Sequence, residues 1–278
     1  MNDKWFKAGK TPSPEIEEFF RERESFCVSA CDRYFNRKSP QNHLWYLKDE
    51  RHKVTALLLH SRSALFPVFG GIEKMPVPRF MGGFLRTFPI HLVQGLKKDV
   101  MLMESVLNLR GYRCLESFDY FLMELKTAPQ PVRSGPPGLQ FRVPVREDLD
   151  QLFDLQAGYE KEEVLPKGAV FSPVSCKLSL EGIFARERML VAELDGRLVG
   201  KVNTNARSFS RYQIGGVYVL PSYRGRGIGL NMAAAFAEML AAEGWKLTLF
   251  VKQQNAAALS IYKHIGFSIQ DDYRISYY

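Results

Sequence analysis

The sequence predicts a two-domain α/β protein, and three observations lead to this fold class. The 278 residues are many for one domain but enough for two, each with its own core. Residues 127–138 contain four prolines, which can continue neither a helix nor a central strand. On both sides of this segment, short β-branched and aromatic runs alternate with longer helical patterns. We therefore expect a smaller α/β domain at 1–128, a proline-rich linker at 129–138 and a second domain at 139–278.

The composition is that of a soluble globular protein, with 46% hydrophobic and 24% charged residues. No apolar run approaches the ~20 residues that a membrane-spanning helix needs, so we expect a cytoplasmic protein without a membrane partner. The four cysteines, at 27, 31, 114 and 176, are too few and too scattered for a disulfide framework. They have no His at ligand spacing, and we expect no metal site.

The net charge of +8 raises the question of nucleic acid binding. No run of Lys and Arg is longer than two residues, and no nucleic-acid-binding motif is present. An enzyme that holds a phosphorylated nucleotide also gathers positive charge at its site. We therefore expect no nucleic acid partner. Separately, we expect a monomer or a homodimer.

The first predicted element is a helix over 13–37. Ser13 can cap it, Pro14 suits its first turn, and the acidic residues that follow complement the helix dipole. Later runs rich in β-branched and aromatic residues predict strands joined by short polar turns. Beyond the helix we expect strands at 44–47, 54–60, 64–69, 88–93 and 120–125, a glycine- and proline-rich segment at 70–83 and a helix at 98–109.

The second domain is predicted to start with a strand and two helices, the first of them led by acidic residues. A hairpin follows, with Asp195-Gly196 as its turn dipeptide. In order, we expect strands at 139–145, 189–194, 198–206, 212–220, 245–251 and 267–278, and helices at 147–159, 173–186, 230–243 and 255–264.

Residues 217–230 join a Val-rich strand to a helix through a basic, glycine-rich turn. The glycines leave backbone N–H groups open to an anion, and the helix adds the positive end of its dipole. A Walker loop would need Gly-Lys-Ser/Thr, and a Rossmann loop would need GxGxxG near the start of a βαβ unit. Neither pattern is present here, so the turn predicts another kind of phosphate site. Its residues are Arg224, Gly225, Arg226, Gly227, Ile228 and Gly229.

The pattern Arg-x-x-Gly-x-Gly in this turn resembles the acyl-CoA loop of the GCN5-related N-acetyltransferases (GNAT). A second signature of that family, NxxA followed by YxxxGF, has its counterpart further along the chain. Two motifs in the right order make the resemblance specific, and it covers 139–278. It implies the GNAT fold there, with a mixed, largely antiparallel sheet, and acetyl-CoA as the acyl donor. The second signature is carried by Asn255, Ala258, Tyr262, Gly266 and Phe267.

The resemblance also implies roles for single residues. In the family, backbone groups of the strand before the loop pair with the pantetheine arm and polarise the thioester carbonyl. The family's Asn lies along the pantetheine, and its Tyr hydroxyl faces the thioester sulfur as the acid. The corresponding residues here are Val217, Tyr218 and Val219 on the strand, Asn255 with Ala258 along the pantetheine, and Tyr262 as the acid.

The general base is less defined, because residues 212–218 carry no acid where many relatives place a Glu. The nearest acids lie between the first two helices of the domain, where the family closes over its substrate. We place the base at Glu163, with Glu162 next and Glu160 as a substrate contact; a solvated acidic helix end is the alternative for each.

Side-chain amides stand on what should be central strands, at Asn203, Asn205 and Gln213. Buried amides need hydrogen-bond partners, so these residues are candidates for contacts to the acceptor. Bonds to neighbouring backbone are the alternative for each of them.

The predicted element order of the first domain roughly repeats that of the second. Residues 91–98 lie where we expect its phosphate loop, yet they contain a single glycine. We interpret 1–128 as a degenerate GNAT-like half that has lost its cofactor loop; an unrelated α/β domain is the alternative. The tandem arrangement resembles that of two-domain bacterial predicted acetyltransferases.

The predicted function is transfer of an acetyl group from acetyl-CoA to a primary amine, by direct attack in a ternary complex. A non-catalytic CoA-binding sensor or scaffold is one alternative, and the missing strand acid favours it. An aminoacyl-tRNA-dependent transferase is another, although such tandem enzymes tend to lose the CoA loop in both halves. The identity of the acceptor amine stays open, since a fold does not name a substrate.

Overall fold

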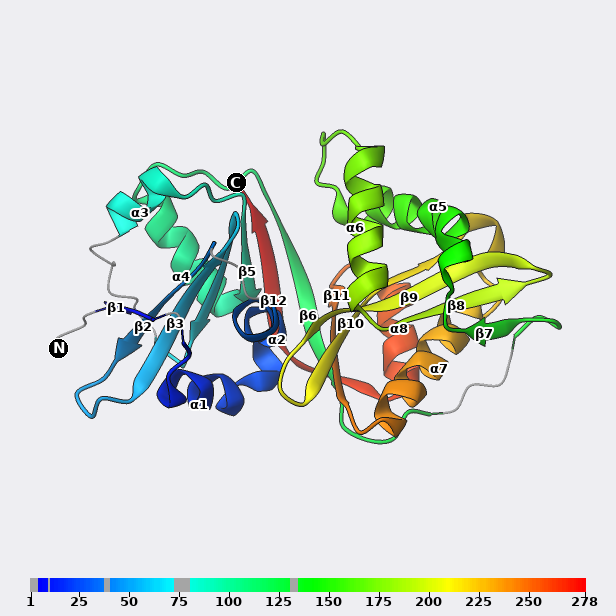
Figure 1. The fold of residues 1–278 in the computed structure, drawn as a ribbon, viewed down its shortest axis with the longest axis horizontal. Coiled ribbons are helices and arrows are strands. Elements are labelled where there is room, and N and C mark those ends of the chain that lie inside the picture. Colours follow the sequence, from blue (N-terminus) through cyan, green and yellow to red (C-terminus); the bar gives the residue numbers. More distant parts are fainter. Residues whose placement is uncertain (1–4, 10, 38–40, 73–80, 131–134) are drawn as a thin grey trace. The chain divides into compact units, whose positions relative to one another are not determined.

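The computed structural model describes residues 5–9, 11–37, 41–72, 81–130 and 135–278. By their contacts these residues form two compact units (Figure 1). The first comprises Met1–Leu122, Arg207–Phe209 and Asp271–Tyr278, and the second comprises Met123–Ala206 and Ser210–Gln270. The predicted boundaries, 1–128 and 139–278, stay a prediction, and residues 131–134 of the predicted linker lie outside the described residues.

The first unit is built on a sheet whose early strands form an antiparallel meander. Its fifth strand then runs parallel to the fourth, with Ala64 opposite Leu92 and Leu65 opposite Val93. The strand order is β1-β2-β3-β4-β5-β12-β6. The strands are β1 (Trp5–Lys7), β2 (Asn42–Lys48), β3 (Val54–Ser61), β4 (Ala64–Phe69), β5 (Leu92–Leu96), β6 (Glu116–Leu125) and β12 (Phe267–Tyr277). The α-helices are α1 (Pro14–Glu22), α2 (Val28–Cys31), α3 (Met81–Thr87) and α4 (Lys97–Asn108).

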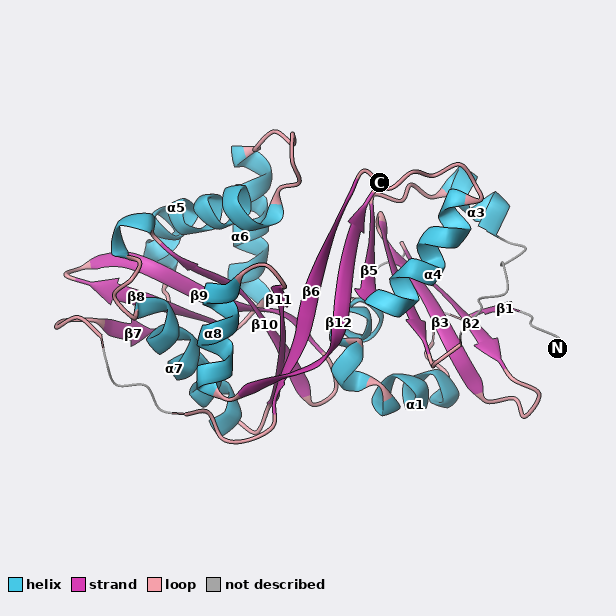
Figure 2. Cartoon of the chain, turned by 180° about the vertical axis from the view of Figure 1, so that it is seen from behind, coloured by secondary structure: helices cyan, strands magenta, loops and turns pink. Residues whose placement is uncertain are grey.

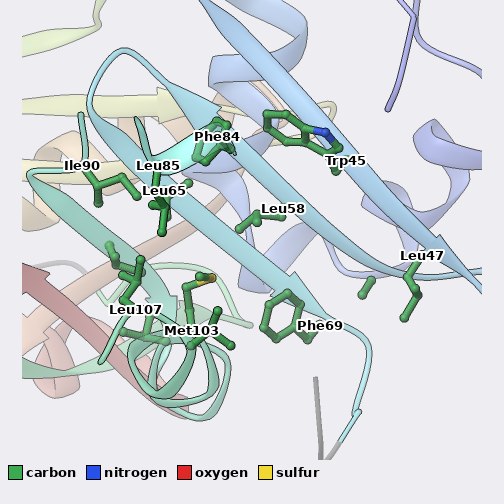
Figure 3. Close-up of a cluster of buried hydrophobic side chains, with 14 residues drawn as sticks. Trp45, Leu47, Leu58, Leu65, Phe69, Phe84, Leu85, Ile90, Met103 and Leu107 are labelled. Atoms are coloured by element: carbon green, nitrogen blue, oxygen red, sulfur yellow. The ribbon is translucent and has the colours of Figure 1, made fainter. Parts of the chain in front are cut away.

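Apolar side chains cover both faces of this sheet, because β3 is apolar on each side. Leu58 packs with Trp45 and with Met103 of α4 in one cluster (Figure 3). Leu57 and Leu59 point to the other face and pack against α1 and α2. Two-sided burial explains why β3 reads as a continuous apolar run rather than an alternating one.

The predicted helix over 13–37 is wrong as a single element. It is broken into α1, a 3-10 turn at Glu24–Phe26, α2 and a π-helical turn at Asp32–Asn36. The apolar spacing that starts with Ile16, Phe19 and Phe20 would require apolar side chains one turn later, where Arg23 and Glu24 stand. The break lets the second half of the segment bury its own apolar face.

The second unit has the strand order β7-β8-β9-β10-β11, in which β11 runs parallel to β10. The hairpin turn at Asp195-Gly196 is confirmed, since both residues have positive φ, 51° and 76°. The strands are β7 (Gln140–Arg142), β8 (Met189–Leu194), β9 (Arg197–Arg207), β10 (Arg211–Val219) and β11 (Lys246–Lys252). The α-helices are α5 (Leu149–Tyr159), α6 (Pro173–Arg186), α7 (Ile228–Ala242) and α8 (Ala256–Ile265).

Helices α5 and α6 cover one face of this sheet, and α7 and α8 cover the other (Figure 2). Leu152, Leu155 and Leu180 pack with Val191 and Leu198 on the first face. A Cβ on Gly200 would point toward Met232 of α7. Because neighbouring residues of a strand point to opposite faces, Lys201 points toward α5 and α6. The predicted fold class is confirmed: an α/β chain with a mixed, largely antiparallel sheet.

The placement of the lost phosphate loop at 91–98 is wrong. Leu92–Leu96 is β5, and α4 starts directly at Lys97. In both units the parallel strand is followed by a helix, so α4 corresponds to α8 and not to α7. The segment that corresponds to the loop of the second unit therefore lies between β4 and β5, and part of it is outside the described residues.

Candidate functional site

The glycine-rich loop lies between the end of β10 and the start of α7. A 3-10 turn, Pro221–Tyr223, leads into it. Gly225 and Gly227 have φ values of 76° and 75°, a left-handed conformation that disfavours any side chain. Gly227 is the residue directly before α7, whose first N–H groups have no partner within the helix. The loop therefore presents backbone donors at the positive end of a 15-residue helix.

Two arginines accompany these donors. Arg224 Nε donates to Val219 O at 2.9 Å, and its Nη2 lies 2.8 Å from Glu162 Oε2. Arg226 Nη2 reaches Ser222 O at 3.4 Å. The Arg224 side chain is 46% exposed, so it can still meet an anion from solvent. Gly229 is not required for space, since a Cβ there would make ordinary contact with Val219 at 3.6 Å.

Strand β10 leaves its pairing with β11 before it reaches the loop. The parallel pairing runs from Arg211 opposite Lys246 to Ile214 opposite Leu249. Leu220 N donates to Val199 O of β9 at 2.9 Å. Because successive residues of a strand point to opposite sides, the backbone groups of Val217 and Val219 point away from β9, along the edge of β10 that lies past its pairing with β11. The Val219 carbonyl on this edge accepts from Arg224 Nε. These are backbone groups that the resemblance assigns to the acyl donor.

Helix α8 supplies the second motif. Tyr262 is buried, and its pKa is raised by burial and then by the neighbouring Tyr159 and Glu163, so that it keeps its proton. Asn255 Oδ1 accepts a hydrogen bond from Ala258 N at 3.0 Å and thereby caps the helix. The Asn255 oxygen is thus engaged in the fold, which leaves its amide nitrogen as the group for a ligand.

The three acids between α5 and α6 are held in different ways. Glu162 accepts from Tyr218 Oη at 2.7 Å and pairs with Arg224. Burial raises the pKa of Glu162, but these two hydrogen bonds outweigh it and hold the pKa below its ordinary value. Glu163 pairs with Lys252 Nζ at 3.1 Å, whereas Glu160 accepts from Gln156 Nε2 at 2.9 Å.

Tyr218 is tied to the same acid. Burial, and then the hydrogen bond to Glu162, raise the pKa of Tyr218 to about 12. Its ring also packs beneath Arg224, whose guanidinium carbon lies 5.2 Å from the ring centre. The strand, the loop and the acidic turn are thereby linked through one set of contacts.

Of the amides on the central strands, Asn203 is buried and hydrogen-bonded, and Asn205 is half-buried. Asn203 Nδ2 donates to Thr204 O at 2.9 Å and to Asn205 Oδ1 at 3.1 Å, and Asn203 Oδ1 accepts from Lys201 Nζ at 2.9 Å. Gln213 is buried as well. In this structure the Asn203 amide bonds to groups of β9 itself, including the backbone of Thr204, which was the alternative to a contact with the acceptor.

Sequence reasoning missed Lys201, which is fully buried at the centre of this set. Its position between Val199 and Val202, inside a predicted strand, was the available signal. Lysine is almost never buried without a partner, so a Lys within an apolar strand predicts a specific polar contact.

The described residues contain no group of three or more His, Cys, Asp or Glu side chains that could hold a metal ion. Within the same residues, no helix combines the length and the apolar character that crossing a membrane requires.

Residues 152–267 match the model of the acetyltransferase (GNAT) family. The chain is 34% identical over 88 residues to an acetyltransferase of Yersinia pseudotuberculosis, a match that covers 31% of this chain and 60% of the relative. It is also 34% identical over 85 residues to an acetyltransferase of Sodalis glossinidius, covering 30% of this chain and 58% of the relative. The chain thus spans less than two thirds of the length of these relatives.

Solved structures show the same fold over the whole chain. A Drosophila protein from structural genomics has a TM-score of 0.68 and 14% identity, and covers 100% of this chain and 99% of its own. A tandem GNAT protein from the clavulanic acid biosynthesis pathway has a TM-score of 0.55 and 10% identity, and covers 98% of this chain and 97% of its own. The match to the acetyltransferase (GNAT) family thus falls on residues 152–267, and the relatives found for the chain are acetyltransferases.

Proposed function

We propose that the second unit transfers an acetyl group from acetyl-CoA to a primary amine by direct attack within a ternary complex. The observation that carries this proposal is the joining of two features in one stretch of chain. Residues Val217–Val219 form the end of β10, past its pairing with β11, and lead directly into the glycine-rich loop at the N-terminus of α7. A ligand with a pyrophosphate and an amide-containing arm needs both features side by side.

The residues present fit acetyl-CoA as a substrate. The N–H groups of Gly225 to Gly229, together with Arg224 and Arg226, would hold its pyrophosphate. The backbone of β10 would pair with the pantetheine amides as an added strand does. Asn255 and Ala258 would lie along the same arm.

The transfer has three requirements: a neutral amine, a polarised carbonyl and a protonated leaving group. The amine nitrogen forms a bond to the acyl carbon, and the carbon–sulfur bond breaks. Tyr262, which keeps its proton because burial raises its pKa, would donate to the sulfur. A carboxylate would accept the proton that the amine loses, and we place this role at Glu163.

Two observations favour Glu163 over Glu162 as the base. Glu162 already carries two hydrogen bonds, from Tyr218 and Arg224, which hold its pKa below the ordinary value and make it a weaker base. Glu163 lies close enough to Tyr262 to raise the pKa of that phenol. The acceptor would enter beside these groups, with Glu160, Asn203, Asn205 and Gln213 as the polar residues of its site.

The first test is calorimetric titration of acetyl-CoA into the full-length chain, with free thiol followed in the same mixtures. The Arg224→Ala/Gly227→Glu double variant removes a cation from the loop and places an acid at its left-handed N-cap, so we expect binding to be lost. Lys246→Ala is the matched control, because it removes an exposed cation of the same unit away from the loop.

Binding that survives in the control and is lost in the double variant supports the loop assignment. Thiol release that a primary amine accelerates supports transfer. Tight binding without any thiol release across an amine screen would favour the CoA sensor instead. Absence of binding to the unmodified chain would contradict the acyl-CoA proposal as a whole.

A further inference from the structure

Lys201 is a buried cation of the second unit for which the proposed transfer has no use. Its side chain is 0% exposed, on the face of β9 that α5 and α6 cover. Nζ donates to Asn203 Oδ1 at 2.9 Å and to Gly216 O at 3.0 Å. The ring centre of Tyr159 lies 4.9 Å from the same atom. Complete burial of an ammonium is costly, so these contacts point to a specific task.

The carbonyl that Lys201 holds belongs to an irregular point of β10. Gly216 has φ 58°, a left-handed conformation inside a strand. A side chain at Gly215 would overlap Asn205, and one at Gly216 would overlap Asn203. The alternate residues Lys201, Asn203 and Asn205 of β9 therefore lie directly against this irregular point, and the local sequence Gly-Gly is what makes room for them.

The direction of the next N–H follows from the geometry of the peptide. All described peptide bonds are trans, and in a trans peptide the C=O and N–H groups point in opposite directions. Since Gly216 O points to Lys201 of β9, Val217 N–H points away from β9. The hydrogen bond from Leu220 N to Val199 O gives the same result by strand alternation. Val217 lies beyond Ile214, where the pairing with β11 ends.

We propose that Lys201 is a positioning residue that fixes the Gly216–Val217 peptide, so that Val217 N–H is aimed at the carbonyl oxygen of the bound thioester. This inference rests on the proposed function and deepens it. An N–H donor stabilises a developing oxyanion only when it is already oriented, because reorientation during the reaction would cost free energy. Lys201, with Asn203, supplies that orientation from the β9 side of β10, opposite to the donor.

The charge of Lys201 adds a second effect. Burial lowers the pKa of Lys201 to about 7, while Glu160 and Cys176, which face it from the segments around α5 and α6, act in the opposite direction. A protonated Lys201 draws electron density from Gly216 O and so makes the N–H of the same peptide a stronger donor. As the pH rises through about 7 the charge is lost, and this polarisation is expected to weaken.

The experiment reads the carbonyl directly and needs no acceptor amine. Acetyl-CoA labelled with carbon-13 in the thioester carbonyl is bound to the full-length chain, and its stretching frequency is recorded by isotope-edited infrared difference spectroscopy below and above pH 7. We expect the bound carbonyl to shift to lower frequency, further at the lower pH. Lys201→Met should lose the shift and its pH dependence, and Lys201→Gln, which keeps an N–H donor, should retain part of the shift without the pH dependence.

Turnover provides an independent readout. Removing an oxyanion donor costs about 10²–10³ in kcat, and for Lys201→Met, which misplaces the donor, we expect a loss of about tenfold or more with little change in acetyl-CoA affinity. Lys246→Met, which replaces an exposed lysine of β11, should behave like the unmodified chain.

Four outcomes would overturn the inference. The same carbonyl frequency in Lys201→Met and in the unmodified chain would show that Lys201 does not act on the thioester. A loss of kcat, acetyl-CoA affinity and Tm together, with an unchanged frequency, would show a purely structural role. If kcat of the unmodified chain rises with pH and Lys201→Met abolishes that rise, Lys201 would be a proton acceptor instead. Failure of the unmodified chain to bind acetyl-CoA would overturn the proposed function itself, and this inference with it.

Discussion

At the scale of single residues, Glu162 and Glu163 are neighbours in sequence with different surroundings. Glu162 is held by Tyr218 and Arg224, whereas Glu163 pairs with Lys252. If Glu163 accepts the amine proton, Glu163→Gln should lower kcat by about 10²–10⁴, the usual contribution of a general base. Acetyl-CoA affinity should stay within about twofold, because the base contacts the acceptor and not the donor.

Glu162→Gln is the matched control for this prediction. It breaks the ion pair with Arg224 and leaves that guanidinium free for the pyrophosphate, so we expect its main effect on acetyl-CoA affinity rather than on kcat. The measurement is steady-state kinetics with a saturating amine, beside calorimetric titration of acetyl-CoA. Undiminished turnover in Glu163→Gln would remove this residue from the mechanism.

The residue scale is also where sequence reasoning reached its limit. The loop residues could be named, because Arg224, Gly225 and Gly227 follow one another along the chain and their conformation is local. Lys201 could not be given its role, because its partner Gly216 lies on another strand and only the register of β9 against β10 brings them together. Pairings across strands are set by the fold and are not visible in a local pattern.

At the scale of elements, α8 depends on a cap that is also a candidate ligand-binding residue. Asn255 Oδ1 accepts from Ala258 N at 3.0 Å. Asn255→Ala removes that bond and should lower the free energy of unfolding by about 1 kcal/mol. Asn255→Asp keeps an accepting oxygen at the helix N-terminus, where a negative charge is favourable, so we expect it to retain the stability.

The same pair of variants separates the two roles of Asn255. Asp offers no amide N–H, so Asn255→Asp should bind acetyl-CoA less tightly if the amide nitrogen contacts the pantetheine. Urea unfolding and calorimetric titration of both variants check this prediction. Full affinity in Asn255→Asp would reduce Asn255 to a helix cap.

Most elements of the fold could be predicted, and the exceptions have physical causes. Ala64–Phe69, Pro173–Arg186 and Met189–Leu194 are found at their predicted bounds, because their ends carry local signals such as Pro at the first helical turn or a turn dipeptide. The helix over 13–37 failed because its apolar spacing changes where α1 ends. The placement of the lost loop at 91–98 failed because α4 was matched to the wrong helix of the repeat.

At the scale of the whole molecule, the chain contributes its last described strand to both units. Phe267–Gln270 of β12 belongs to the second unit, and Asp271–Tyr277 belongs to the first. In the first unit, Tyr273 to Tyr277 pair antiparallel with Leu96 to Leu92. Tyr273 and Ile275 are buried there, so this half of β12 is part of the core of the first unit.

Deleting residues 271–278 should therefore destabilise the first unit by removing a paired strand from its sheet. Hydrogen exchange followed by mass spectrometry should show loss of protection in β5, whose partner strand is gone. A chain of full length with Asp271→Asn, which removes one acid and no strand pairing, is the control. Unchanged protection of Leu92–Leu96 after the deletion would contradict the pairing.

In the first unit a carboxylate binds a backbone N–H group at the end of β4. Asp99, near the start of α4, accepts from Phe69 N at the end of β4 at 2.9 Å. Burial raises the pKa of Asp99 to about 6, although the Phe69 hydrogen bond opposes the shift. A backbone donor at the end of the corresponding strand is thus satisfied by the protein itself, which agrees with the interpretation of this unit as a degenerate half.

The split membership of β12 has a consequence for synthesis of the protein on the ribosome. The first unit needs residues 271–277, which are translated only after the whole of the second unit. Its sheet cannot be completed while the chain is growing, because β5 pairs with β12. The edge of β5 therefore stays exposed in the nascent first unit until β12 has been synthesised. All residues of the second unit, which ends at Gln270, are synthesised before residues 271–277. Completion of the N-terminal half is thus expected to be the late, slow event of folding, since it closes a loop of more than a hundred residues.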